Sequence, residues 1–216
     1  MHIRLVLGLS LAAFLTSGCQ TAYYEAWETV GVHKRDILID RVEDVQDAQG
    51  DAKKQFSSAL EQYQQLIHIE DQNLLKRYKA LNSEFEDSEE AAKAVSKRID
   101  DVEDVSEDLF KEWQKELDLY TNAELKQQSA STLSSTKKKY KKLVASMRAA
   151  EAKMAPVLNA LRDQVLFLKH NLNARAIDSL KGELSSIESN VATLVKEMEK
   201  SIAESEAFIN ELNNSN

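Results

Sequence analysis

The fold is decided by the stretch IDSLKGELSSIESNVATLVKEMEKSI, residues 177–202. Its large apolar residues recur at alternating steps of three and four, from Ile177 and Leu180 through to Met198. This spacing places one apolar stripe along a single side of an α-helix. A stripe so narrow and regular is typical of coiled coils and slender bundles. The stretch therefore predicts a long amphipathic helix that must bury its stripe against another helix.

Three further stretches carry the same pattern: residues 38–67, 74–120 and 133–172. No segment of comparable length alternates between apolar and polar residues, as a half-buried strand would. Glycine is missing between Gly50 and Gly182, and Pro156 is the only proline of the chain. The frequent turns of a β-sandwich or barrel are therefore not encoded.

These stripes predict an all-α fold, an elongated antiparallel bundle of about four long helices with coiled-coil-like packing. Each stripe occupies about 40–50 residues, which corresponds to about 60–75 Å of helix. Similar lengths joined by short connections favour antiparallel neighbours. Two long hairpins, or fewer and longer helices paired with a second copy of the chain, fit the same pattern, so a homo-oligomer stays open.

Breaks between the stripes are expected at residues 67–73, 121–136 and 171–173, where the apolar signal fades. The sequence TNAE at 121–124 has the form of a capping box. An asparagine within 171–173 suits the left-handed position after a helix. Pro156 follows Ala155, a poor cap, so we predict a kink within one helix there rather than a new helix.

Composition narrows the class of protein. The chain is 43% hydrophobic and 30% charged, has a formal charge of -8, and contains a single cysteine. One cysteine excludes a disulfide scaffold, and five glycines exclude collagen-like sequence. The acidic balance argues against nucleic acid as a partner and against a chain that lies flat on anionic lipid.

The N-terminus predicts a lipoprotein. Residues 1–18 combine Arg4, a short apolar run and small residues, which is typical of a secretory signal peptide. Cys19 follows Ser17 and Gly18 and resembles the lipid-accepting cysteine of a bacterial lipobox, with an ordinary signal peptide and an incidental cysteine as the alternative. Gln20 in place of aspartate favours the outer membrane. We therefore expect a signal peptide over 1–18, a lipid-anchored segment over 19–29 and one helical domain over 30–216, on the periplasmic side.

Motifs of catalysis and metal binding are missing from the sequence. No histidine follows a glutamate by three residues, and neither a His-Glu-x-x-His motif, a Gly-rich phosphate loop nor a Gly-x-Ser-x-Gly elbow occurs. We expect no catalytic residue, no metal and no cofactor, and hence no enzyme. The acidic residues between 84 and 108 are interpreted as solvated helix faces, with calcium binding, for which the glycine turn is missing, as the alternative. The basic run 137–142 is interpreted as pairing with acidic neighbours, with phosphate or lipopolysaccharide binding as the alternative.

Two polar clusters interrupt the apolar pattern and are the candidate interaction or ligand residues: Gly31, His33, Lys34 and Arg35 near the anchor, and Lys169, His170, Asn171, Asn173 and Arg175 near the third break. For the second cluster a loop explains both asparagines and is favoured over a ligand site. Tyr23, Tyr24 and Trp27 either form an aromatic foot at the membrane surface or close the end of the bundle.

Several segments resemble a known family: 23–24 (YY), 31–38 (GVHKRDIL), 40–44 (DRVED), 167–176 (FLKHNLNARA) and 179–184 (SLKGEL). They are similar to an uncharacterised family of bacterial envelope lipoproteins, catalogued as a domain of unknown function (DUF2959). The resemblance covers nearly the whole mature chain. It implies a signal peptide and a helical body, and it implies no activity, ligand or catalytic residue.

The sequence thus favours an outer-membrane-anchored lipoprotein with a structural, scaffolding or protein-interaction role, whose partners are the membrane, through Cys19, and an envelope protein. The alternative is a periplasmic module that binds a ligand in a cavity between helices. Such a module would need a polar group inside the core, for which His33 and His170 are the first candidates.

Overall fold

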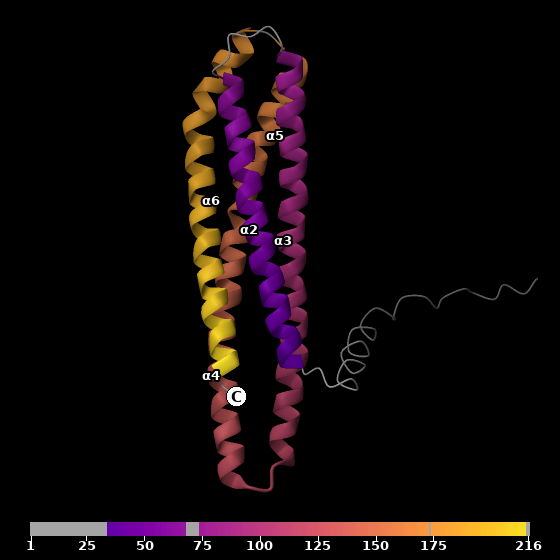
Figure 1. The fold of residues 1–216 in the computed structure, drawn as a ribbon, viewed down its shortest axis with the longest axis vertical. Helices are drawn as coiled ribbons and strands as arrows, with labels where there is room; N and C mark the ends of the chain where they lie inside the picture. The colour runs from indigo at the N-terminus through magenta and orange to yellow at the C-terminus, as the bar shows by residue number, and fades with distance from the viewer. Residues whose placement is uncertain (1–33, 68–73, 173, 215–216) are drawn as a thin grey trace, which may run out of the picture.

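The computed structural model describes residues 34–67, 74–172 and 174–214, and over these ranges it is a bundle of α-helices without strands (Figure 1). The helices are α2 (Lys34–Ile67), α3 (Leu74–Glu116), α4 (Ala123–Ala152), α5 (Met154–His170) and α6 (Ala174–Asn214). A short 3-10 helix, η1 (Leu117–Leu119), ends α3. The predicted all-α fold is confirmed.

The helices form an elongated up-and-down bundle. Helix α2 packs against α3 and α6, and the rod formed by α4 and α5 packs against the same two helices from the opposite side. Helices α2 and α3, α3 and the α4–α5 rod, and that rod and α6 run antiparallel (Figure 1), as short connections between helices of similar length favour. The apolar stripes of the described helices close on one another within a single chain.

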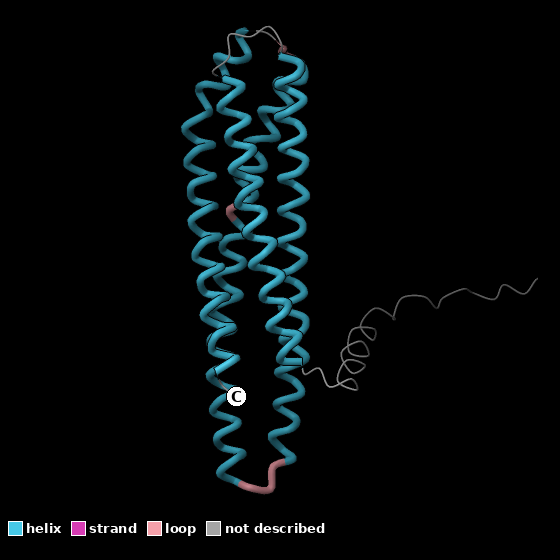
Figure 2. The backbone as a smooth tube through the Cα atoms, in the orientation of Figure 1, coloured by secondary structure: helices cyan, strands magenta, loops and turns pink. Residues whose placement is uncertain are grey.

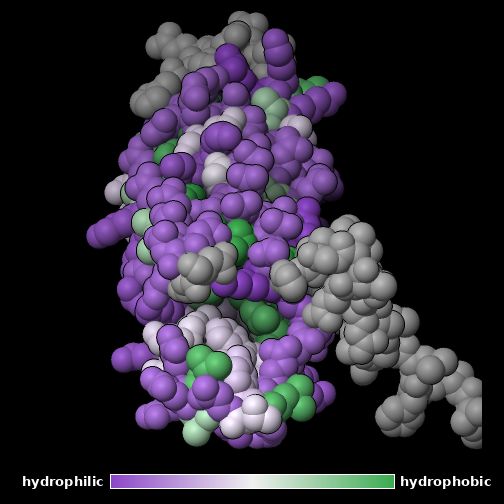
Figure 3. Space-filling view, turned by 60° about the horizontal axis from the view of Figure 1, so that its bottom comes forward, coloured by the Kyte–Doolittle hydropathy of each residue, from purple (hydrophilic) through white to green (hydrophobic). Residues whose placement is uncertain are grey.

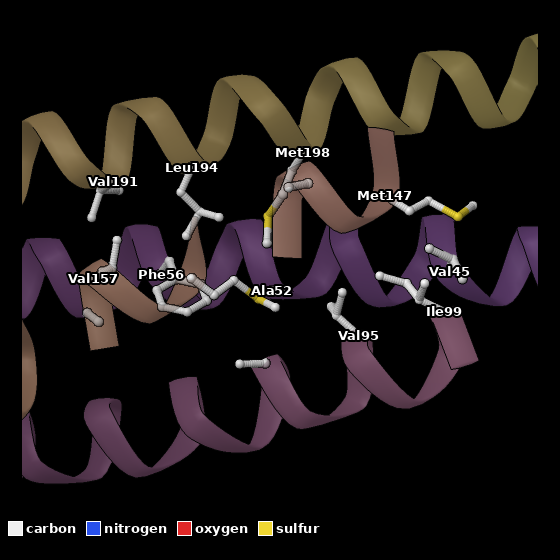
Figure 4. Packing of buried hydrophobic residues seen from close by; sticks show 14 of the residues in the cluster. Val45, Ala52, Phe56, Val95, Ile99, Met147, Val157, Val191, Leu194 and Met198 are labelled. Carbon is white, nitrogen blue, oxygen red and sulfur yellow. The ribbon is translucent and has the colours of Figure 1, made fainter. Parts of the chain in front are cut away.

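The core runs the length of the bundle and is built from layers of apolar side chains. Figure 4 shows one region, where Phe56 of α2, Ile99 of α3, Met147 of α4 and Met198 of α6 point into the space between the helices. All four side chains are fully buried. Packing of this kind supplies most of the stability of such helices, because an isolated helix is marginal in water.

The buried positions of the helices follow the heptad spacing more strictly than the positions of the apolar residues alone indicate. Gln49 of α2 and Ser201 of α6 are completely buried, whereas the adjacent Ala48 and Ile202, apolar residues of the stretches 38–67 and 177–202, are only half-buried. The predicted stripes were wrong at these points because the three-four rhythm continues through polar residues. Gln49 and Ser201 are therefore among the polar side chains that interrupt the hydrophobic stripes inside the bundle.

The predicted kink lies between α4 and α5. A single residue, Lys153, separates the two helices (Figure 2), and its backbone N–H donates to the carbonyl of Ala150 at 3.0 Å. Pro156 lies in the first turn of α5, and because it has no N–H it cannot bond the carbonyl of Ala152. The interruption thus follows from the proline, as expected, but the prediction of a single kinked helix is wrong, because a new helix begins at Met154.

The predicted breaks lie where helices end, but the second is much shorter than 121–136, because α4 already begins at Ala123. Helix α2 ends at Ile67 and α3 begins at Leu74. At the second break, Asn122 rather than Thr121 is the N-cap of α4, and its side-chain oxygen accepts from the N–H groups of Glu124 and Leu125. At the third, Asn171 has φ −132°, so it does not take the left-handed conformation.

Asn171 instead ends α5 through its side chain, which donates to the carbonyl of Phe167 at 2.9 Å. The signal peptide, Cys19 and the aromatic segment 23–27 lie outside the described residues. No helix in the described ranges combines the length and the apolar character that crossing a bilayer requires.

The hairpin of α3 and α4 projects beyond the rest of the bundle. Helix α2 begins and α6 ends at the same end of the rod, and the last part of α3, η1 and the first part of α4 continue past both (Figures 1 and 2). Lys34, the first residue of α2, contacts Glu112, so α3 runs on for more than a helical turn beyond it. The rod therefore has two different ends.

Candidate functional site

A crevice opens where the four-helix section gives way to the projecting hairpin. It has a volume of about 260 Å³ and is lined by the residues that we call the hairpin mouth: Arg35, Leu109, Glu112, Trp113, Glu116, Thr132, Thr136 and Leu212. Leu109 and Trp113 come from α3, Thr132 and Thr136 from α4, and Leu212 from the last turn of α6. The crevice exists because α2 and α6 stop here while the arms of the hairpin continue.

The arms of the hairpin are held together by a small core of their own. Phe110, Leu117 and Leu133 are buried between them, and the rings of Phe110 and Tyr140 meet edge to face with centroids 5.3 Å apart. The indole N–H of Trp113 donates to the hydroxyl of Ser129 at 2.8 Å. The projecting part is thus a packed unit that can carry a fixed surface.

The polar wall of the hairpin mouth is occupied by a structural ion pair. The ammonium of Lys34 is buried and lies 2.9 Å from a carboxylate oxygen of Glu112. A buried lysine needs such a partner, because an unpaired charge in the interior is costly. Lys34, a predicted candidate, therefore joins α2 to α3, while Arg35 beside it lines the crevice.

The second predicted cluster lies at the opposite end of the rod, where α5 ends (Figure 1). Lys169 and His170 are exposed, and Asn171 is half-buried. Gly31, His33, Asn173 and the side chain of Arg175 lie outside the described residues. The structure thus separates the two predicted clusters, so the described members form no common ligand site.

Apolar side chains accompany Lys169 and His170 at that end. Leu166 is 52% exposed, Phe167 39% and Leu172 39%. Leu75, in the first turn of α3, is exposed at the same end. We call this group the far end: Leu75, Leu166, Phe167, Lys169, His170 and Leu172. Its mixture of bare apolar and basic groups is typical of contact surfaces rather than of solvated helix faces.

The charged runs along the flanks pair across helices. Lys139 contacts Glu211, and Lys142 lies 2.8 Å from Glu204, so these members of the basic run 137–142 pair with α6, as predicted. Arg148 of α4 reaches Asp100 and Glu103 of α3. These pairs connect neighbouring helices, and each exposed one contributes little to stability.

Bonds to acidic side chains, foremost Glu103, raise the pKa of Arg148 above its ordinary value, so it stays charged. Among the described residues, no three His, Cys, Asp or Glu side chains gather with a geometry that could hold a metal ion.

Sequence reasoning missed the crevice and the exposed end of the hairpin. Leu119 is 78% exposed and Tyr120 41%, although the apolar stripe through residue 120 placed Tyr120 in the core. A signal was present: from 119 to 136 the only charged residues are Glu124 and Lys126. A helix so poor in charge, in a chain so rich in it, differs from an ordinary solvated face.

Comparison with known families gives one result. A family model described as "Protein of unknown function (DUF2959)" matches residues 23–212. The matched region ends at Leu212, which lines the hairpin mouth, and begins before α2. A search of curated proteins finds no match.

Proposed function

The chain belongs to the DUF2959 family, and we propose that it is a lipid-anchored scaffold of the bacterial envelope whose rod presents its far end to an envelope protein. One observation carries the proposal. The start of α2, the helix nearest Cys19 in the described chain, lies at the hairpin end, whereas the exposed group around Phe167 lies at the opposite end.

A rod of this kind would separate its anchor from its contact surface. Helix α3 alone has 43 residues, which corresponds to about 65 Å at 1.5 Å per residue. The lipobox-like sequence before Cys19 supports acylation there, and several acyl chains make a stable anchor. Gln20 supports the outer membrane, with the rod in the periplasm.

The chemistry of the far end supports a protein partner. Leu166 and Phe167 offer apolar area that the bundle does not use, and Lys169 adds a positive charge beside them. Interfaces combine an apolar centre with polar groups at the rim, and aromatic residues often dominate their energy. The proposal assigns contacts, and no catalysis, to the predicted candidates Lys169, His170 and Asn171.

The anchor is tested with Cys19→Ser. The wild-type chain should fractionate with outer membranes, and the mass of its N-terminal peptide should show a diacylglycerol and a further acyl chain on Cys19. The variant should lose both the acyl mass and the membrane association. A wild-type N-terminus without acyl chains would refute the anchor.

The contact surface is tested by photo-crosslinking in living cells. p-Benzoylphenylalanine at Phe167, whose exposed ring leaves room for the added benzoyl group, should give a discrete adduct with one envelope protein. Thr193, an exposed residue midway along α6, is the matched control and should give none. An equal yield from both positions, or no adduct from Phe167, Leu166 and Leu75 alike, would refute the proposed contact.

The crevice at the hairpin mouth favours a second candidate function, the binding of a small apolar ligand. Trp113 lies in its wall, so a naphthalene dye that enters should quench the tryptophan emission. Thr132→Phe should fill the crevice and abolish this effect. The matched control is Thr193→Phe, since both threonine hydroxyls donate to a carbonyl one turn earlier in an exposed helix surface. Identical dye titrations of both variants would exclude the crevice as the binding site.

A further inference from the structure

The tip of the hairpin carries large apolar side chains that the fold leaves exposed to solvent. We call residues 119–125 the hairpin tip; within it Leu119 is 78% exposed, Leu125 50% and Tyr120 41%. Figure 3 shows green and pale surface gathered at the hairpin end, below a flank that is mostly purple. We propose that the hairpin tip inserts into the lipid surface of the membrane that carries the anchor, and so holds the rod upright.

The tip lies where the anchor can bring it to lipid, a step that rests on the proposed acylation of Cys19. Helix α2 starts level with Glu112, and the tip lies only about 10 Å further along the rod. The chain from Cys19 to Lys34 can span up to about 50 Å when extended. The tether is therefore long enough for the tip to reach the same bilayer.

The chemistry of the tip matches an interface between lipid and water. Tyrosine settles at the level of the headgroups because its ring is apolar and its hydroxyl is polar. The leucines offer apolar area that lipid would cover. Between 119 and 136 the charged residues are Glu124 and Lys126, and Lys126 lies 3.2 Å from Asp118. Insertion should therefore depend on apolar contact and not on the charge of the lipid.

The flanks of the rod suit water better than lipid. They carry cross-helix ion pairs such as Lys53 with Glu199 and Arg162 with Glu89. The chain as a whole is acidic, with a formal charge of -8. Anionic lipid repels such a surface, so contact through the tip is favoured over a rod that lies flat.

The single cysteine of the chain allows a direct test. In the acylated full-length mature protein the thiol of Cys19 is blocked, so a cysteine introduced elsewhere is the only free one. Leu119→Cys and Leu125→Cys are labelled with a nitrobenzoxadiazole dye, and the proteins are incorporated into phosphatidylcholine vesicles with or without phosphatidylglycerol. Leu75→Cys, which is similarly exposed at the opposite end, is the matched control.

The labels at 119 and 125 should shift to the blue and be quenched by nitroxide lipids, equally in both vesicle types and at high salt. The label at 75 should stay water-exposed. Labels at all three positions that remain in water on floating vesicles would overturn this inference and leave the anchor intact. A wild-type chain that does not float would overturn the anchor and this inference together. A tip protected in native envelopes but not in protein-free vesicles would show that it binds a protein, which also overturns the inference.

Discussion

At the scale of single residues, the most unusual side chain of the core is Gln49. It is completely buried, and neither atom of its amide has a hydrogen-bond partner in the protein. The pairs Gln46–Ile202 and Lys53–Glu199 on either side place it level with Ser201, whose hydroxyl also has no partner. Such groups are destabilising, and a buried polar residue in a helical seam often serves to fix the register.

This predicts that Gln49→Met stabilises the protein. The substitution keeps the volume and removes an unsatisfied amide, so the free energy of unfolding should rise by about 1–3 kcal/mol in urea titrations. Gln46→Met is the matched control one turn away. Because the amide of Gln46 donates to the carbonyl of Ile202 at 3.2 Å, its loss should lower stability by about 1 kcal/mol. A loss of stability in both variants would contradict this account of Gln49.

Tyr63 couples stability to alkaline pH. Its hydroxyl is buried and donates to the carbonyl of Leu180 at 2.7 Å, and burial, with a smaller effect of Glu183, raises the pKa of Tyr63 above 10.0. The unfolded chain loses this proton first, so the contribution of Tyr63 is complete below about pH 10 and is lost as the pH rises further.

Tyr63→Phe should therefore cost about 1 kcal/mol near neutral pH, and its disadvantage should shrink between about pH 9 and 11. Urea titrations across this range measure the difference from the wild-type chain. Tyr120→Phe changes an exposed tyrosine and should leave the curve unchanged. A constant difference across the range would refute the link between Tyr63 and alkaline pH.

At the scale of the elements, the α4–α5 junction keeps the rhythm of the core. The buried residues Met147, Ala150, Met154 and Val157 continue in steps of three and four across Lys153. A continuous helix would therefore bury the same side chains. The interruption is a local effect of Pro156 and not a requirement of the packing.

Pro156→Ala should therefore join α4 and α5 and stabilise the protein by about 1–3 kcal/mol, with a rise in helical circular dichroism. As the converse control, Ala145→Pro places a proline at an exposed position inside α4, where it should cost about 3 kcal/mol or more. A Pro156→Ala variant that is less stable than the wild-type chain would show that the bend itself is required.

The elements also show what sequence can and cannot predict. Apolar periodicity found the helices and their order, because burial of one stripe per helix dominates the fold. It misplaced Ala48 and Ile202, since a heptad position filled by Gln49 or Ser201 is invisible to an apolar count. The far end was only half recognised: its polar residues were singled out, while Phe167, with its exposed ring, was not.

At the scale of the whole molecule, the two ends of the rod differ because the helices stop at different levels. The sequence of any one helix does not show this. The hairpin projects because α2 begins and α6 ends before α3 and α4 meet. Periodicity within one helix does not reveal which helices end level with one another. The crevice at the hairpin mouth follows from that mismatch, so it could be recognised only once the helices were placed in space.

The same mismatch predicts uneven stability along the rod. From 123 to 132 every residue of α4 is exposed or half-buried, whereas further along Leu143, Met147 and Ala150 are buried against neighbouring helices. Local opening costs least where few apolar contacts are lost.

Amides of the hairpin up to about residue 132 should therefore exchange with deuterium well before those of 143–165, as mass spectrometry of peptides would measure. Vesicle-bound acylated protein should show slower exchange at residues 119–125 if the tip enters lipid. Uniform protection along α4 in the absence of lipid would mean that the projecting arms are covered by something other than this bundle.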